Sequence, residues 1–174
     1  MRANNKLMSG LFPNNPIGRD VIGYPEHLKN PSMVNIMNFY HTWYVPNNMV
    51  IVMSGDIDFE KTIKLIDNTF GRFPSKELPK IQEIREKPIT QPVVREVTGP
   101  EAEQVLLAYR FDGYKSEDRK FVNMIDYILT NSTAGLIDLD LNQKQKVLHA
   151  DCGSYFLKDY GFQEFSGTPR KGQS

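Results

Sequence analysis

A proline-rich, highly charged stretch in the middle of the chain limits what this sequence can fold into. Residues 74–92 read PSKELPKIQEIREKPITQP and contain four prolines. Proline lacks a backbone N–H and disfavours helix interiors and central strands, so the stretch predicts an extended linker rather than a core element. We therefore expect three parts: residues 1–75, a linker over residues 76–92, and residues 93–174.

Bulk composition predicts a globular chain and excludes several classes of protein. The 174 residues suffice for one medium domain or two small ones. Lys+Arg and Asp+Glu both number 21, a balance that argues against a nucleic-acid-binding face. No apolar run reaches the roughly 20 residues of a membrane span, and the start of the chain lacks the apolar stretch of a secretory signal. The single cysteine, Cys152, excludes an internal disulfide and leaves the compartment open.

The first part predicts a helix followed by a strand. Apolar residues recur at helical spacing over 33–44, Ser32 is placed to cap that helix, and Pro46 ends it. Residues 49–54 are a short apolar run without the alternation of a half-exposed strand. We expect them to form a buried central strand, in which Val52→Asp would be strongly destabilising.

A second helix is predicted after this strand. Asp58 is placed as its N-cap, and Phe59, Ile63, Ile66 and Phe70 share one face. Gly71 is expected to end the helix in the left-handed conformation.

The second part predicts interleaved strands and helices, and thus an α+β fold. We expect a mixed, largely antiparallel sheet covered by helices on one face. The predicted strands are 93–97, 104–111, 150–157 and 162–165, the last two joined as a hairpin; the predicted helices are one capped by Ser116, with Phe121, Ile125, Ile128 and Leu129 on one side, and one over residues 135–148.

Four short motifs follow one another in the first half. They are Gly23-x-x-Glu26-x-Leu28, Tyr44-x-Pro46-x-Asn48-Met49, Gly55-Asp56-x-Asp58 and Phe70-Gly71-x-Phe73-Pro74. This ordered set resembles the insulinase/pitrilysin family of zinc metallopeptidases. The second half matches less closely, with Leu129-Thr130-Asn131 where the family often has Leu-Gly-Gly. We assign structural roles to the matched residues, because they suit caps and turns.

The family's inverted zinc motif, His-x-x-Glu-His, occurs nowhere in the chain. Family members hold zinc in one domain, and a related domain without the motif helps to enclose the peptide. By the family's order, the motif and the third ligand, a glutamate, would precede residue 1. The resemblance thus implies the remainder of one peptidase-like domain, over residues 1–75, and the start of the next, over residues 93–174.

Other candidates for metal binding fail on residue type or spacing. A zinc site needs about three converging protein ligands, and Glu26-His27 lacks the first histidine, with Gly23 in its place. His41 lies among aromatic residues and is expected to be a packed side chain. His149-x-x-Cys152 has metal-like spacing but no second pair of ligands.

The acidic run over residues 138–142 does not match a calcium loop, and the chain lacks the motifs of nucleophilic catalysis and phosphate binding. Asp138-Leu139-Asp140-Leu141-Asn142 resembles the start of a calcium loop, but Gln143 and His149 stand where Gly and Glu are required. No Gly-x-Ser-x-Gly and no glycine-rich phosphate loop is present. We therefore predict no catalytic, cofactor-binding or metal-binding residue in this chain.

The function that the resemblance implies is that of a non-catalytic structural and substrate-enclosing segment of a zinc metalloendopeptidase. The alternative is an assembly or binding module of a relative that has lost catalysis, and whether the parent is an enzyme stays open. Both ends suggest a piece of a longer polypeptide. The expected partners are the rest of that polypeptide, its peptide substrate and, for the isolated chain, a second copy; zinc would be bound outside this chain. Bacterial cytoplasm and cell envelope both remain possible.

Overall fold

The computed structural model describes residues 2–100 and 102–173, which divide into two compact units. The sheet unit comprises Met1–Val21 and Ile84–Ser174, and the helical unit comprises Ile22–Glu83. Each unit is described by itself. Among the described residues, no helix is both long and apolar enough to cross a membrane.

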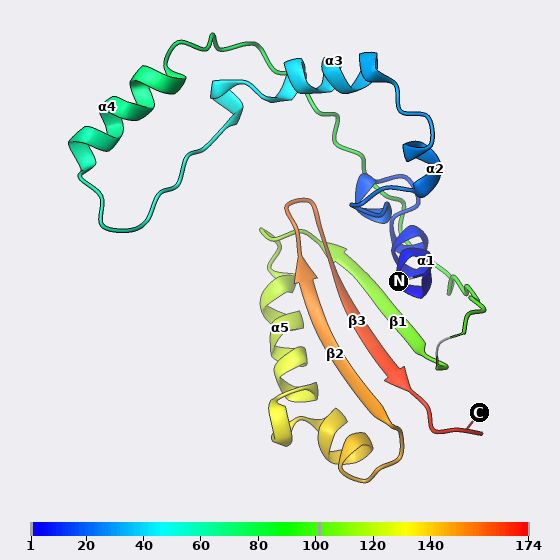
Figure 1. Cartoon of the computed structure of the whole chain (residues 1–174). Coiled ribbons are helices and arrows are strands. Elements are labelled where there is room, and N and C mark those ends of the chain that lie inside the picture. Colours follow the sequence, from blue (N-terminus) through cyan, green and yellow to red (C-terminus); the bar gives the residue numbers. More distant parts are fainter. Residues whose placement is uncertain (1, 101, 174) are drawn as a thin grey trace. The chain divides into compact units, whose positions relative to one another are not determined.

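The sheet unit is built on a three-stranded antiparallel sheet (Figure 1). The strands are β1 (Val105–Asp112), β2 (His149–Phe156) and β3 (Tyr160–Thr168), in the order β1-β3-β2. β2 and β3 form the predicted hairpin, and the strand predicted at residues 104–111 is β1. The register pairs Leu107 with Phe165 and Phe165 with Cys152. The predicted α+β class, with a largely antiparallel sheet, is confirmed.

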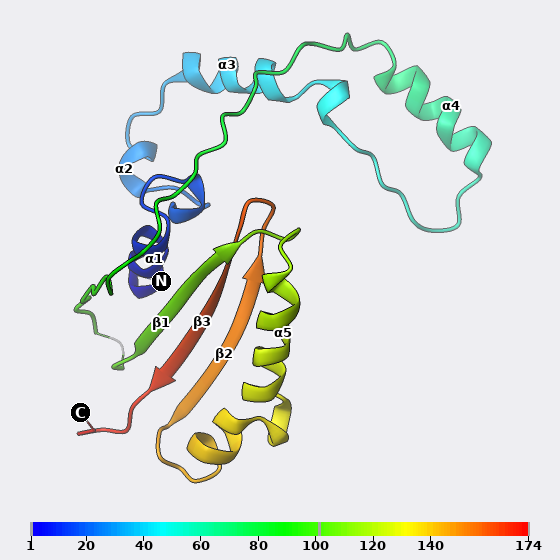
Figure 2. The same ribbon diagram turned by 180° about the vertical axis from the view of Figure 1, so that it is seen from behind.

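Helices contact both faces of this sheet (Figure 2). Residues opposite one another in neighbouring strands share a face, and alternate residues point to opposite faces. Helix α5 (Asp118–Leu129) contacts the face of Cys152 and Gln163. Helix α1 (Arg2–Leu11) contacts β1 and packs against the opposite face, a contact that the sequence did not predict.

The core of the sheet unit lies between α1 and its sheet face. Leu11, Phe12, Tyr160 and Phe162 form one buried cluster, in which Phe12 is only 1% exposed. The ring of Phe12 meets the ring of Tyr160 at 5.5 Å and that of Phe162 at 6.2 Å, in tilted and edge geometries that favour aromatic pairs. The chain continues from Phe12 into a short 3-10 turn, η1 (Pro16–Gly18).

The segment between α5 and β2 is less helical than predicted. In place of a helix over residues 135–148, it contains η3 (Ser132–Ala134) and the short π-helical turn η4 (Asp138–Asn142). The Asn142 side chain donates to the Ala150 carbonyl at 2.9 Å and accepts the Ala150 N–H at 2.8 Å. This pairing connects the end of η4 to the second residue of β2. Helix α5 itself starts at Asp118, whose N–H the Ser116 hydroxyl accepts at 3.1 Å.

The predicted strand at residues 93–97 is wrong. These residues carry no strand, and the Val93 side chain lies beside Gly10 of α1. The preceding residues Ile84, Glu86 and Lys87 are tied by hydrogen bonds to the α1–η1 region and to Arg110.

The helical unit consists of α2 (Pro25–Leu28), α3 (Met33–Trp43), η2 (Pro46–Asn48) and α4 (Phe59–Phe70). The predicted caps are confirmed: the Ser32 hydroxyl accepts the Asn35 N–H at 3.3 Å, and the Asp58 carboxylate accepts the Lys61 N–H at 3.0 Å. The left-handed conformation predicted for Gly71 is wrong, because its φ of −61° and ψ of −17° continue the right-handed turn.

The predicted buried strand over residues 49–54 is also wrong. Its residues are extended but belong to no sheet, and Val50 and Val52 are 88% and 86% exposed. The helical unit holds no strand among its described residues, so nothing within it supplies a ladder partner. Helices α3 and α4 bury no residue, and Val45 is the one buried residue between 22 and 83.

Candidate functional site

A hollow of about 1170 Å³ lies around the outer edge of β1 in the sheet unit. Its walls come from α1, from the extended segment 85–97 and from β1 itself. The lining mixes apolar side chains, such as Leu7 and Leu107, with charged ones, such as Arg95 and Asp118. We call this feature the β1-edge hollow.

The outer edge of β1 is open to a further strand. β1 is an edge strand that pairs only with β3. Within the described residues, no backbone hydrogen bond reaches β1 from the side opposite β3. An edge of this kind presents free N–H and C=O groups to an extended polypeptide.

Arg110 of β1 holds one end of the hollow together. Its guanidinium donates to the carbonyls of Leu11 and Lys87, which lie in α1 and in the extended segment. The same group lies 5.8 Å from the ring centre of Phe12 and 5.7 Å from that of Tyr160, within cation–π range. A single cation therefore joins three segments that are far apart in sequence.

Glu86 completes this junction. Its carboxylate accepts the N–H groups of Asn14 and Asn15, both at 2.7 Å, and the Asn14 side-chain amide at 3.0 Å. Partial burial pushes the pKa of Glu86 upward, but these hydrogen bonds and the charge of Arg110 outweigh it, so its pKa lies below the ordinary value. The Glu86 N–H donates to the Tyr160 hydroxyl at 2.6 Å. We call Arg110, Glu86 and these partners the α1 junction.

Cys152 belongs to a polar cluster beneath α5. Gln163 donates to the Asp126 carboxylate at 2.6 Å, and the Thr130 hydroxyl donates to the Cys152 carbonyl at 3.0 Å. Burial raises the pKa of the Cys152 thiol, and the nearby negative charges of Asp126 and Asp151 act in the same direction. A thiol with a raised pKa is a poor nucleophile, so this cluster favours packing over catalysis.

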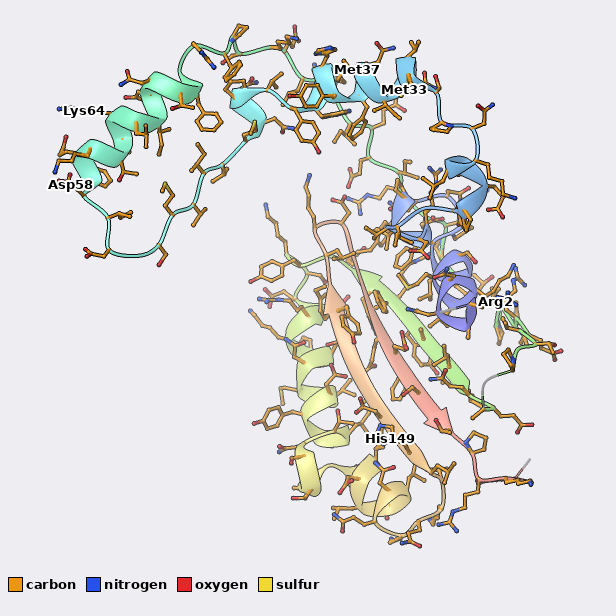
Figure 3. All side chains as sticks on the ribbon, in the orientation of Figure 1. Arg2, Met33, Met37, Asp58, Lys64 and His149 are labelled. Atoms are coloured by element: carbon orange, nitrogen blue, oxygen red, sulfur yellow. The ribbon has the colours of Figure 1, made fainter. Side chains whose placement is uncertain are left out.

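The histidines considered from sequence belong to three different elements. His27 is in α2, with its ring 5.5 Å from that of Tyr24, and His41 is in α3 beside Tyr40. His149 begins β2, as Figure 3 shows, and is three residues from Cys152 in the same strand. An odd separation along a strand points two side chains to opposite faces, so His149 and Cys152 do not converge.

The two carboxylates of the acidic run over residues 138–142 are paired with side chains that follow closely in sequence. Asp138 accepts from the Gln143 side chain at 2.7 Å, and Asp140 pairs with Lys144 at 2.6 Å. The hydrogen bond from Lys144, followed by its charge, lowers the pKa of Asp140. Both carboxylates thus have partners on their own short segment.

The residues present do not fit a zinc site. Across residues 2–100 and 102–173, no group of three or more His, Cys, Asp or Glu side chains lies close enough to hold a metal ion. Zinc sites in proteins take three or four such ligands. No chemical step is therefore assigned to a metal on this part of the chain.

Sequence reasoning missed the α1 junction. One signal was present: Arg110 is the single charged residue inside the apolar run from Val105 to Phe111. Such a residue often marks a specific partner. The partners themselves, Leu11 and Lys87, carry no pattern that could have identified them, because they accept through main-chain carbonyls.

Comparisons with known sequences all point to one protein family. A family model described as "Peptidase M16 inactive domain" matches residues 35–172. The "Probable zinc protease PqqL" of Haemophilus influenzae is 32% identical over 69 residues, which are 40% of this chain and 8% of that protein. The "Zinc protease PqqE" of Helicobacter pylori is 20% identical over 138 residues, 72% of this chain and 29% of that protein.

Solved structures give the same fold. The periplasmic protease PqqL from Escherichia coli matches with a TM-score of 0.65 and 18% sequence identity, over 97% of this chain and 20% of that one. At this identity the likeness concerns the fold. The matches thus span less than a third of the length of each of these three relatives.

Proposed function

Because the chain belongs to the family of the Peptidase M16 inactive domain, we propose that it is a non-catalytic structural and substrate-enclosing segment of a zinc metalloendopeptidase. The family match over residues 35–172 is the observation that carries this proposal. The relatives named zinc proteases support it, since each is much longer than the part that matches this chain.

Zinc would be bound by a part of the parent polypeptide outside this chain. The described residues offer no ligand cluster, and the sequence lacks the His-x-x-Glu-His motif. The contribution of this chain would then be to bind, orient and enclose. A peptide substrate is the proposed ligand, and the rest of the polypeptide is the proposed partner. The proposed parts remain residues 1–75 and 93–174 with a linker between them.

The β1-edge hollow is the feature most suited to an enclosing role. It combines a free strand edge with walls that carry both charges and apolar side chains. An extended peptide could pair with such an edge through its main chain, without a strict sequence requirement. Enclosure by one domain is useful to a peptidase because it excludes water and orients the peptide for a catalytic group on another domain.

The alternative is an assembly or binding module of a relative that has lost catalysis. The exposed apolar segment over residues 49–53 suits an interaction surface, which both the enclosing segment and the assembly module would need. The experiment that separates the two is to sequence the reading frame upstream of residue 1 and assay the longest natural polypeptide. A His-x-x-Glu-His motif, with peptide hydrolysis that a chelator abolishes and zinc restores, supports the peptidase. Absence of the motif and of hydrolysis refutes the peptidase and leaves the assembly module.

A further inference from the structure

A five-residue segment with the composition of a strand lies on the wall of the β1-edge hollow. Residues 93–97 read VVREV, and valine is a residue type that is enriched in strands. The segment starts directly after Pro92 and contains no proline, so each of its residues keeps a backbone N–H. Within the described residues, it carries no regular secondary structure, and none of these N–H groups donates to another backbone group. We call residues 93–97 the strap.

The strap and β1 expose apolar side chains to the same hollow. Val94 of the strap is 74% exposed and lines the hollow, as Val97 does. From β1, Val105 is 66% exposed and Leu107 is 50% exposed, and both line the hollow as well. When two strands pair, β-branched and aliphatic side chains of this kind meet across the ladder and stabilise the sheet. The strap thus supplies what the outer edge of β1 lacks.

The connections of the chain set the direction in which the strap runs. The Lys87 carbonyl accepts from Arg110, close to the end of β1 at Asp112. From Lys87 the chain passes through the strap and enters β1 at its start, Val105. The strap therefore runs antiparallel to β1, on the same side of β1 as α1 (Figures 1 and 2). Antiparallel strands can be joined by a short connection, and a segment that is held at both ends loses little entropy when it pairs.

We propose that the strap is a reversible gate on the β1-edge hollow. It closes by pairing antiparallel with the outer edge of β1 as a fourth strand, and it opens to admit an extended peptide to the same edge. Strap and peptide use the same N–H and C=O groups of β1, so each excludes the other. The structure holds the open arrangement. The inference rests on the proposed function, in which a peptide occupies the hollow, and adds how access to the hollow is regulated.

The strap is short enough for a peptide to displace it. β1 spans eight residues, so a peptide paired along its whole length would form more main-chain hydrogen bonds than the five-residue strap can. The open arrangement also has a contact of its own, because the Arg95 guanidinium donates to the Val94 carbonyl at 3.0 Å. Short strands that carry charges are typical of sheet edges that pair without aggregating. These features suit a strand that has to leave its edge again.

Hydrogen exchange on residues 1–174 tests the closed arrangement directly. Residues 77–82 are the internal reference, because they too have no regular secondary structure and no backbone hydrogen bond within the described part of the chain. A strap that is closed about nine-tenths of the time should hold amides that exchange about tenfold more slowly than the reference, after correction for intrinsic rates. Strap amides that all exchange as fast as the reference would overturn the proposal.

A pair of proline substitutions disables the gate. Val94→Pro with Arg95→Pro removes two consecutive N–H groups, one of which faces β1 in any register, because successive N–H groups of a strand point to opposite edges. Lys80→Pro with Ile81→Pro is the matched control, since it removes one cation and one β-branched residue from the reference segment. The probe is a fluorescein-labelled peptide with the sequence of residues 90–98, TQPVVREVT, and its binding is measured by fluorescence anisotropy.

The probe should bind the Val94→Pro/Arg95→Pro variant about tenfold more tightly than it binds the unsubstituted chain or the control variant, because only about one tenth of the latter two is open. Equal affinity for all three proteins, or binding to none of them, would overturn the gate. If the proline pair prevents folding, seen as lost protection of β2 and β3, the exchange rates of the unsubstituted strap decide alone. These readouts need neither zinc nor turnover, so failure of the proposed peptidase function, measured by hydrolysis in the longer polypeptide, is scored separately.

Discussion

The carboxylate of Glu86 accepts the backbone N–H of Asn15 at 2.7 Å, across 71 positions of sequence. Asn15 in turn donates its side-chain amide to the Ile84 carbonyl at 3.0 Å. These bonds tie the extended segment after the helical unit to the turn that follows α1. With Arg110, they hold α1 on the sheet face that α5 leaves free.

Glu86→Gln should destabilise the sheet unit by about 1 kcal/mol or less at neutral pH, because solvent screens this half-exposed carboxylate. The pKa of Glu86 is lower in the folded state than its ordinary value of 4.5. Its stabilisation is therefore complete above that value and is lost as the pH falls through the lower folded value. In denaturant melts from pH 7 to pH 3, the free energy of unfolding should fall less steeply with acidification for Glu86→Gln than for the unsubstituted chain. Exposed Glu77→Gln is the control, and identical profiles for all three proteins would contradict the role of Glu86.

Phe12→Ala should be the most damaging of the simple truncations. Phe12 is the largest fully buried side chain and contacts two other rings, so its loss should cost about 3 kcal/mol. Phe39→Ala, on an exposed face of α3, should cost about 0.5 kcal/mol or less. Equal costs in a denaturant melt would show that α1 does not pack on the sheet.

Cys152 should react slowly with an aromatic disulfide reagent at neutral pH. Its side chain is buried and the pKa of its thiol is raised, so the thiolate fraction and its access are both small. We expect the rate to rise by about tenfold or more in denaturant. An exposed thiol introduced by Ser75→Cys in a Cys152→Ala background serves as the control and should react at similar rates in both conditions. A native Cys152 that reacts as fast as this control would disprove the buried position.

Val52→Asp should leave the free energy of unfolding of residues 1–174 unchanged within about 0.5 kcal/mol, because Val52 is 86% exposed. The sequence alone predicted the opposite, a large loss of stability from this substitution. The same change should reduce self-association in light scattering, since exposed apolar surface promotes it. A loss of several kcal/mol in the free energy of unfolding would contradict the exposed position and support the buried strand predicted from sequence.

Local signals in the sequence predicted local structure well. Ser32 and Asp58 cap helices as expected, since a capping side chain acts within a few residues. The β2–β3 hairpin is likewise local. Residues 49–54 and 93–97 failed because a strand needs a partner, and neither segment has one among the described residues.

The α1 junction could not be predicted from sequence for a related reason. Its acceptors at Leu11 and Lys87 are main-chain carbonyls, which every residue carries. Their use is decided by the tertiary fold. Metal binding was judged from two separate observations. The sequence lacks the zinc motif. The structure shows that Asp138 and Asp140 already pair with neighbouring side chains.

We predict that this chain supplies no catalytic metal centre of its own. The most direct test is to wash residues 1–174 with chelator, reload them with zinc, and measure bound zinc together with hydrolysis of a quenched peptide. We predict no stoichiometric zinc and no chelator-sensitive turnover, because no described cluster can hold the metal that activates water. One tightly bound zinc per chain, or chelator-sensitive turnover that survives repurification, would contradict the account.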